Sequence, residues 1–185
     1  MRGWGGVKIE PNDIFITPPD LVRYCLEVLE VDLQEPQISV LDPCAGNGAW
    51  SSQLEALCPH RVWSREILQG LDFYDETDQF DWIIGIPPFS NLDKWLSHSS
   101  KIARRGIAYT LPGHALSYSR LRLMESFGWF ICGLHSFENP KTWNNGFPHF
   151  FVIWRKNPHL HPACRPLAKT LGEPTQKQVR LGEFE

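Results

Sequence analysis

Apolar runs and segments of helical spacing follow one another through most of the chain. The apolar runs are short and bounded by Gly, Pro or polar residues, and they predict strands at 38–41, 61–65, 70–74, 80–85 and 106–111. Helices are predicted over 19–29, from 48 to about 57, over 91–102 and over 119–127. Strands that alternate with helices in this way predict a mostly parallel sheet, covered by helices on both faces.

Two further apolar runs, 129–137 and 147–154, are joined by a turn-rich stretch without a helix. They predict an antiparallel strand pair at one edge, which completes a mostly parallel seven-stranded sheet. We therefore expect one α/β domain over 13–156. Residues 157–185 are polar with scattered prolines and no apolar periodicity, so they predict a flexible C-terminal tail.

The composition narrows the class of protein. A chain of 185 residues with 42% hydrophobic residues suits a single core. The net charge of −3 gives the whole chain no strong attraction to nucleic acid, so such binding would need a local patch. Five irregularly spaced cysteines without a CxxC pair predict reduced thiols and an intracellular protein. No apolar stretch is long enough to span a membrane, and no metal site is predicted.

Acidic and glycine residues stand at the ends of the first three predicted strands. The loop from Asp42 to Gly48 contains two glycines, which let a backbone approach a ligand closely, and it leads into a helix whose start favours electron-rich groups. Glu66 ends the second run and suits the hydroxyls of a ribose. Asp72 and Phe73 end the third and suit the amine and the ring of an adenine. Ligands bind at such strand ends in open α/β sheets.

The order of these residues resembles the S-adenosylmethionine-dependent amino-methyltransferases of the N6-adenine type, over roughly 13–156. The loop from Asp42 to Gly48, with the sequence DPCAGNG, is similar to their DPxxGxG motif, and Thr17-Pro18 before a helix is similar to their methionine-side motif. The resemblance implies a Rossmann-like methyltransferase fold, S-adenosylmethionine as cofactor, and DNA or RNA as substrate. It implies cofactor contacts at Thr17, Pro18, Asp42, Pro43, Cys44, Ala45, Gly46, Gly48, Glu66, Asp72 and Phe73.

The turn Ile86-Pro87-Pro88-Phe89 follows the apolar run 80–85 and is similar to the catalytic tetrapeptide of this family. In the family, Asn or Asp stands first, and its side chain and the carbonyl of the next Pro accept hydrogen bonds from the target amine. The aromatic residue stacks on the extruded base. The resemblance thus places the catalytic loop at Ile86, Pro87, Pro88 and Phe89, although the side chain of Ile86 accepts no hydrogen bond.

Two interpretations of this turn remain open. In the first, the protein is an active methyltransferase in which Ser90 or Asn91 replaces the missing acceptor. In the second, it is a catalytically inactive protein of the same fold that binds nucleic acid or a partner protein. A methyltransferase for a group that needs no amine acceptor is a third interpretation, for which the sequence offers no positive sign.

The target side is expected around the stretch 137–146. The resemblance places a target-stacking aromatic at Phe137, with Trp143 nearby, and the polar loop offers Lys141 and Asn144 to a nucleic acid. The basic cluster 101–105 and the tail are further candidates for phosphate contacts. Little of the chain remains for a separate target-recognition domain, so we expect either a single-stranded or structured nucleic acid as the target, or a protein partner that supplies target recognition.

Overall fold

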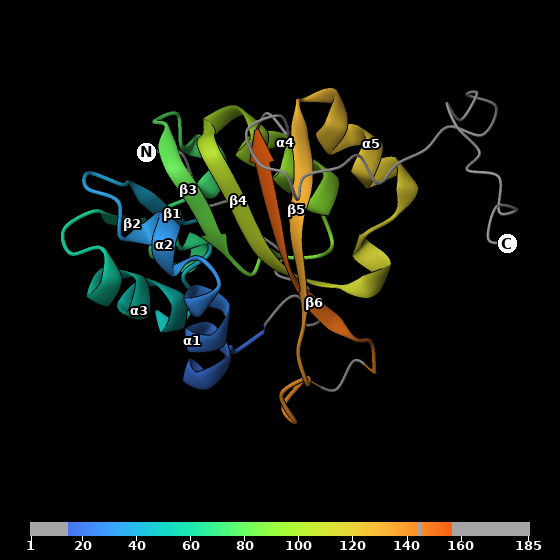
Figure 1. Ribbon diagram of the computed structural model, residues 1–185, viewed down its shortest axis with the longest axis horizontal. Coiled ribbons are helices and arrows are strands. Elements are labelled where there is room, and N and C mark those ends of the chain that lie inside the picture. The colour runs from blue at the N-terminus through green and yellow to red at the C-terminus, as the bar shows by residue number, and fades with distance from the viewer. Residues whose placement is uncertain (1–14, 144–145, 157–185) are drawn as a thin grey trace, which may run out of the picture.

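Six strands form one mixed sheet in the computed structural model, which describes residues 15–143 and 146–156 (Figure 1). The strand order is β2-β1-β3-β4-β6-β5, with β1 parallel to β2 and β3, and β3 parallel to β4. β6 runs antiparallel to both β4 and β5. The bounds are β1 Val40–Asp42, β2 Val62–Ser64, β3 Phe80–Gly85, β4 Ala103–Pro112, β5 Trp129–Ser136 and β6 His149–Lys156. The predicted antiparallel pair at one edge is confirmed.

Helices cover both faces of this sheet, as the alternation in the sequence predicts. One face buries Trp82, Ile84 and Phe151 against α1, α2 and α3, whereas the other buries Ile83 and Val152 against α4 and α5. Neighbouring strand residues point to opposite faces, so two separate apolar cores result. The bounds are α1 Pro19–Glu27, α2 Glu30–Leu33, α3 Ala49–Leu57, α4 Leu92–Ile102 and α5 Tyr118–Ser126.

The predicted third strand, 70–74, is wrong, and with it the count of seven strands. Residues Phe73–Asp75 form a short 3₁₀ turn, η3, instead of a strand. The carboxylate of Asp72 accepts a hydrogen bond from the backbone N–H of Tyr74 at 2.9 Å, which caps this turn. Gly70 reverses the chain just before it with a φ of +83°. A side chain that bonds to its own backbone competes with strand pairing, and here it prevails.

Local signals account for the starts of two helices. Pro18 and Pro19 stand at the cap and first position of α1, where a missing N–H costs no intrahelical bond. Ser117 caps α5, since its hydroxyl oxygen accepts from the backbone N–H of Arg120 at 3.5 Å. The short helix α2, which was not predicted, buries Leu33 in the core beside α1.

The amino-terminal edge of the sheet is held by a stacked ring and two ion pairs. Trp82, Gly106 and Arg155 lie side by side on β3, β4 and β6. The guanidinium of Arg155 lies 4.8 Å from the Trp82 ring and donates to both carboxylate oxygens of Asp32, at 2.9 and 2.5 Å. Arg105 pairs likewise with Glu35, at 2.5 and 2.7 Å. These contacts tie the segment after α1 to the start of the sheet.

The structure also bears on the expected state of the cysteines and on the absence of a membrane-spanning segment. Cys25, Cys44 and Cys58 are free thiols, as expected for these three residues. Within 15–143 and 146–156, no helix has the length and apolar character needed to cross a membrane. The predicted tail, 157–185, lies outside the described residues.

Candidate functional site

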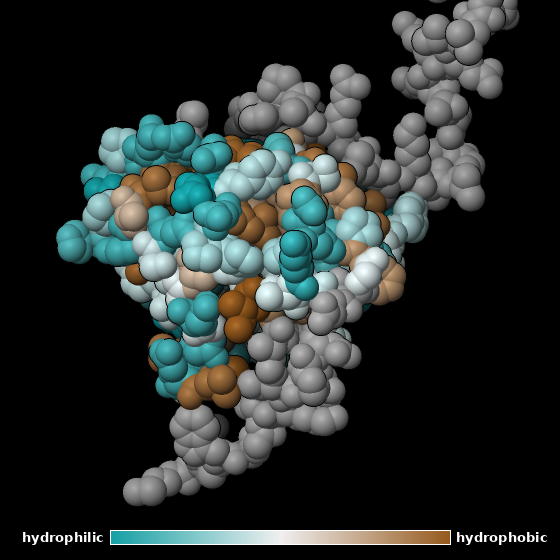
Figure 2. Space-filling model, turned by 90° about the horizontal axis from the view of Figure 1, so that it is seen from below, coloured by the Kyte–Doolittle hydropathy of each residue, from teal (hydrophilic) through white to brown (hydrophobic). Residues whose placement is uncertain are grey.

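The carboxyl ends of the parallel strands meet at the lower edge of the sheet in Figure 1. β1 ends there at Asp42, β3 at Gly85 and β4 at Pro112. The antiparallel strands bring the start of β6 and the end of β5 to the same edge, because His149 pairs with Pro112. Figure 2 views the molecule from this side, and apolar side chains lie exposed near the middle of the mostly hydrophilic surface drawn for the described residues. All the predicted site residues among the described ones lie on elements or loops at this edge.

The loop 42–48 is shaped by its acid and its two glycines. The buried Asp42 carboxylate accepts from the hydroxyl of Ser51 at 2.5 Å and from the backbone N–H of Cys44 at 3.4 Å. Gly46 and Gly48 have φ values of +54° and +82°, in the left-handed region that favours glycine. The second of them directly precedes α3, so the chain turns sharply from the strand end into the helix start.

Burial raises the pKa of Asp42 to about 6, because desolvation disfavours its charged form. The hydrogen bonds from Ser51 and Cys44 oppose this shift, and the negative charge of Glu66 adds to it. At neutral pH the carboxylate is therefore ionised at a cost to the folded state.

We expect the substitution Asp42→Asn to stabilise the ligand-free protein at pH 8 by about 2 to 3 kcal/mol. The folded pKa lies above the unfolded value, so the contribution of Asp42 to stability is greatest below about pH 4 and is lost as pH rises through about 6. An amide does not titrate, so the gain should shrink towards pH 4. Urea unfolding at pH 8 and pH 4.5 measures it. Asp75→Asn, at an exposed carboxylate, is the control; an Asp42→Asn effect that is equal at both pH values would contradict the expectation.

Glu66 is held against the glycine loop. Its two carboxylate oxygens accept from the backbone N–H of Gly46 at 2.7 Å and of Leu68 at 3.0 Å. Each oxygen keeps a second lone pair, so the side chain can still accept hydroxyl groups. The structure thus brings the predicted ribose acid and the predicted glycine loop into direct contact.

Asp72 and Phe73 are placed differently from each other. The Asp72 carboxylate is partly exposed and uses one oxygen to cap η3. The ring of Phe73 is only 2% exposed and packs 4.4 Å from Trp95 and 4.7 Å from His98. In this arrangement the Phe73 ring is a core contact, and what it can present to a ligand is the backbone at the start of the turn.

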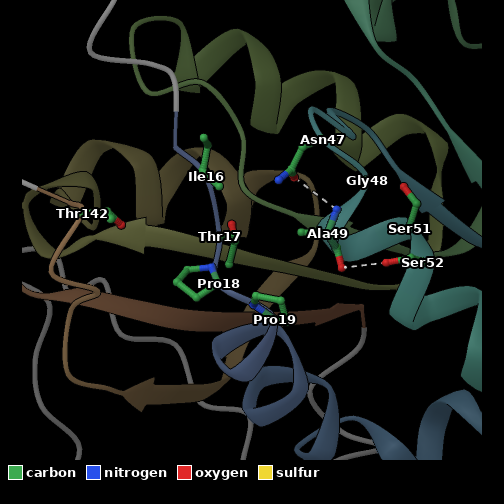
Figure 3. Close-up of a pocket in the computed structure, with 10 residues that line it drawn as sticks. All are labelled: Ile16, Thr17, Pro18, Pro19, Asn47, Gly48, Ala49, Ser51, Ser52 and Thr142. Atoms are coloured by element: carbon green, nitrogen blue, oxygen red, sulfur yellow. Dashed lines mark hydrogen bonds between the residues drawn. The ribbon is translucent and has the colours of Figure 1, made fainter.

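A pocket of about 640 Å³ lies between the segment 15–18 and the start of α3. Figure 3 shows Thr17, Pro18 and Pro19 on one side of it and Asn47, Gly48, Ala49, Ser51 and Ser52 on the other, with Ile16 and Thr142 completing the lining. Two indole N–H groups hold the segment 15–18 in place: Trp50 donates to the Thr17 hydroxyl at 3.3 Å, and Trp143 donates to the Ile16 carbonyl at 3.0 Å. The pocket joins the two predicted cofactor motifs.

The turn 86–89 is joined to the glycine loop by a thiol. Cys44 donates its S–H to the backbone carbonyl of Ile86 at 2.9 Å, and burial raises the pKa of this thiol, which keeps it protonated as a donor. A Cβ at Gly85 would lie 3.2 Å from an Asp42 oxygen, so the turn and the loop pack closely. The partly buried side chain of Ile86 packs against the apolar core on the α1 side, and Pro87 is buried.

Aromatic rings gather beside this turn. Phe15 lies 4.9 Å from Phe89 and 5.5 Å from Trp143, and His149 lies 4.9 Å from Trp143 and 6.0 Å from Phe89. Phe137 reaches Trp143 at 6.2 Å. The predicted target residues Phe137 and Trp143 are therefore neighbours of the predicted catalytic turn, although Trp143 is only 6% exposed.

The rest of the predicted target side is less enclosed. Lys141 is exposed, and Asn144 lies outside the described residues. Phe137 also lines a second pocket of about 480 Å³, together with Tyr24, Pro18 and Glu138. This second pocket adjoins the first at Pro18.

Four residues at this edge were missed by the sequence reasoning: Phe15, Trp50, Ser51 and His149. Each one acts through a contact with a residue far away in the sequence, so no local pattern marks it. Burial lowers the pKa of His149, which keeps its imidazole neutral near pH 7. Its Nδ1 lies 3.2 Å from the Asn139 side-chain oxygen and 3.1 Å from the Phe147 carbonyl, which fixes the loop before β6.

Comparison with known proteins identifies the fold. No family model and no curated protein matches the sequence. Among solved structures, a candidate RNA methyltransferase from Pyrococcus horikoshii matches with a TM-score of 0.65 and 14% identity, over 84% of this chain and 92% of that one. Magnesium protoporphyrin IX methyltransferase from Synechocystis, with bound S-adenosylmethionine, matches with a TM-score of 0.62 and 14% identity, over 83% and 88%.

The methyltransferase subunit of a type I restriction-modification system from Streptococcus thermophilus matches with a TM-score of 0.57 and 14% identity, over 78% of this chain and 45% of that one. At such low identity these likenesses establish the architecture alone. The chain has the Rossmann-like fold of S-adenosylmethionine-dependent methyltransferases, with six strands among its described residues.

Proposed function

We propose that the protein is an S-adenosylmethionine-dependent methyltransferase of the N6-adenine type that acts on nucleic acid. One observation carries the proposal. The segment 15–18 and the glycine loop 42–48 line a pocket of about 640 Å³ at the carboxyl edge of the sheet, and the same loop is hydrogen-bonded to Glu66 and to the turn 86–89. Ligands bind at this edge in open α/β sheets.

The residues present fit the proposed cofactor. The two glycines with positive φ leave backbone close to the loop surface, Glu66 offers oxygens to ribose hydroxyls, and Asp72 offers one to an adenine amine. The pocket beside Thr17 has room for the amino-acid end. When bound, S-adenosylmethionine supplies an electrophilic methyl group on a sulfonium.

The turn 86–89 would orient the methyl acceptor. An exocyclic amine of a base is a weak nucleophile, because its lone pair is delocalised into the ring. The rigid Pro-Pro backbone offers the Pro87 carbonyl to accept from such an amine, and Phe89 offers an aromatic face for the base. Ile86 contributes no side-chain acceptor, and its own carbonyl already accepts the Cys44 thiol.

Nucleic acid is proposed as the substrate class because of two of the structural neighbours. One is described as a candidate RNA methyltransferase and another as a restriction-modification subunit, although a third acts on a porphyrin. The net charge of −3 is unfavourable for binding nucleic acid unaided. A protein partner that contributes target recognition is therefore part of the proposal.

A second candidate function is a non-methylating protein of the same fold that binds nucleic acid or a partner chain. Two observations favour it. Ile86 replaces the polar residue of the related motif, and Phe15 lies against Phe89, where a target base would stack. In this case the pocket would only bind the cofactor or stabilise the fold, without methyl transfer.

Calorimetry with S-adenosylhomocysteine and transfer of tritiated methyl to mixed DNA and RNA test the two candidates. We expect S-adenosylhomocysteine to bind with a Kd in the micromolar range under either candidate function. We expect methyl transfer only if the protein is an active methyltransferase. Gly46→Arg is the control for cofactor binding, because a side chain at φ +54° is strained and enters the proposed site. A folded protein that binds neither S-adenosylmethionine nor S-adenosylhomocysteine would refute the proposed function.

A further inference from the structure

Asp42 is a buried negative charge for which the described residues provide no positive partner. Its exposed fraction is 0%, and none of the ion pairs among residues 15–143 and 146–156 includes it. The nearby charge that bears on it is the like charge of Glu66. Buried charges are ordinarily paired, so a positively charged group that is not among the described residues would stabilise this carboxylate.

Ser51 connects this carboxylate to the pocket. Its hydroxyl lies 2.5 Å from an Asp42 oxygen, and the same residue lines the pocket beside Gly48 and Ala49 (Figure 3). A hydroxyl has one hydrogen and two lone pairs. Because the hydrogen is donated to the ionised carboxylate, the oxygen of Ser51 can offer only an acceptor to a ligand.

Thr17, on the opposite side of the pocket, has the opposite polarity. Its oxygen accepts from the Trp50 indole at 3.3 Å, and its exposed fraction is 3%. Among the residues that the structure describes, no hydrogen bond from this hydroxyl is found, so its hydrogen can be donated to a ligand. The pocket thus offers an acceptor backed by a negative charge on one side and a donor on the other, which suits a group that carries an ammonium and a carboxylate together.

We propose that Ser51 determines specificity for the ammonium group of the ligand in this pocket, because its oxygen accepts from that group with the Asp42 carboxylate behind it. This inference rests on the proposed function, in which the pocket holds the homocysteine end of the cofactor. It assigns to Ser51 a contact that the sequence motifs do not include.

Three ligands test the proposal on the full-length protein by calorimetry. S-adenosylhomocysteine carries the ammonium and the carboxylate, its deamino analogue lacks only the ammonium, and 5′-methylthioadenosine lacks both. In the wild type we expect the Kd of the deamino analogue to be roughly 10- to 100-fold higher than that of S-adenosylhomocysteine. In Ser51→Ala this ratio should fall at least about fivefold, while the Kd of 5′-methylthioadenosine stays within about twofold.

Ser52→Ala is the matched control. Ser52 lines the same pocket on the next position of α3, but its hydroxyl donates to the Ala49 carbonyl instead of Asp42. We expect Ser52→Ala to leave the ratio of the two Kd values unchanged. Ser51→Thr, which keeps the hydroxyl, should give a ratio close to that of the wild type. Equal wild-type affinity for S-adenosylhomocysteine and its deamino analogue would overturn the proposal, as would a Ser51→Ala variant that weakens all three ligands equally. If the folded wild type binds none of the three, the proposed function itself fails.

Discussion

Replacing Ile86 by Asn is expected to raise the rate of methyl transfer to adenine in nucleic acid by roughly 10²- to 10³-fold, the usual effect of one positioned polar group at a reacting centre. The new side-chain oxygen would accept from the target amine beside the Pro87 carbonyl and direct its lone pair towards the methyl group. Tritiated methyl transfer under single-turnover conditions, with enzyme and cofactor in excess over nucleic acid, measures the change.

The fold should tolerate this substitution. Ile86 is only partly buried, and the loss of its apolar contacts should cost about 1 to 2 kcal/mol of stability. Ile86→Leu is the matched control, because it keeps an apolar side chain of the same size and adds no acceptor. An Asn variant that is folded, binds cofactor and is no faster than the Leu variant would show that position 86 does not face the acceptor. If the Ile86→Asn variant transfers methyl groups and the wild type does not, the result would favour the non-methylating function for the natural protein.

The substitution Gly106→Ala is expected to destabilise the protein by about 3 kcal/mol or more, which lowers Tm by roughly 6–12 °C. A Cβ at this position would lie 2.2 to 2.4 Å from three atoms of the Trp82 ring, closer than any real contact. The ring cannot easily move away, because it is fully buried and lies 4.8 Å from the Arg155 guanidinium. Urea and thermal unfolding followed by circular dichroism measure the loss.

A double-mutant cycle with Trp82→Leu identifies the cause. If the collision with the indole is responsible, the loss from Gly106→Ala should be much smaller in the Trp82→Leu background. Gly113→Ala is the control glycine, since its Cβ would meet the partly buried Phe150 ring at 3.1 Å, where a small shift suffices. Additive losses in the cycle would show that backbone effects at Gly106, and not the ring, are the reason.

The parallel core of the fold could be predicted because its signals are local. The run 80–85 and the helix over 91–102 are found within one residue of β3 and α4, since periodicity and flanking turns mark them both. The run 70–74 could not be predicted in the same way. Its apolar residues suit a strand, but Asp72 bonds to the N–H of Tyr74 and selects a 3₁₀ turn, a choice that composition does not reveal.

The candidate site was likewise predictable only where its residues belong to a local sequence motif. Gly46 and Glu66 belong to the predicted cofactor motifs, and the structure places these two residues in contact. The positions of Ser51 against Asp42 and of Trp50 against Thr17 depend on how α3 is rotated on the sheet. For Phe73 the sequence was misleading. An aromatic side chain at this position suggested a surface on which an adenine could stack, but the ring packs in the core beside Trp95.

The ion pairs at the amino-terminal edge of the sheet have a consequence for how this protein can change. Asp32–Arg155 and Glu35–Arg105 lie at the opposite end of the strands from Asp42 and Ile86. Substitutions that strengthen the one end need not disturb the other. Stability gained there would offset the cost of new polar groups at the carboxyl edge. A lineage or a designer could therefore exchange the residue at position 86 repeatedly, and so vary the chemistry, without rebuilding the scaffold.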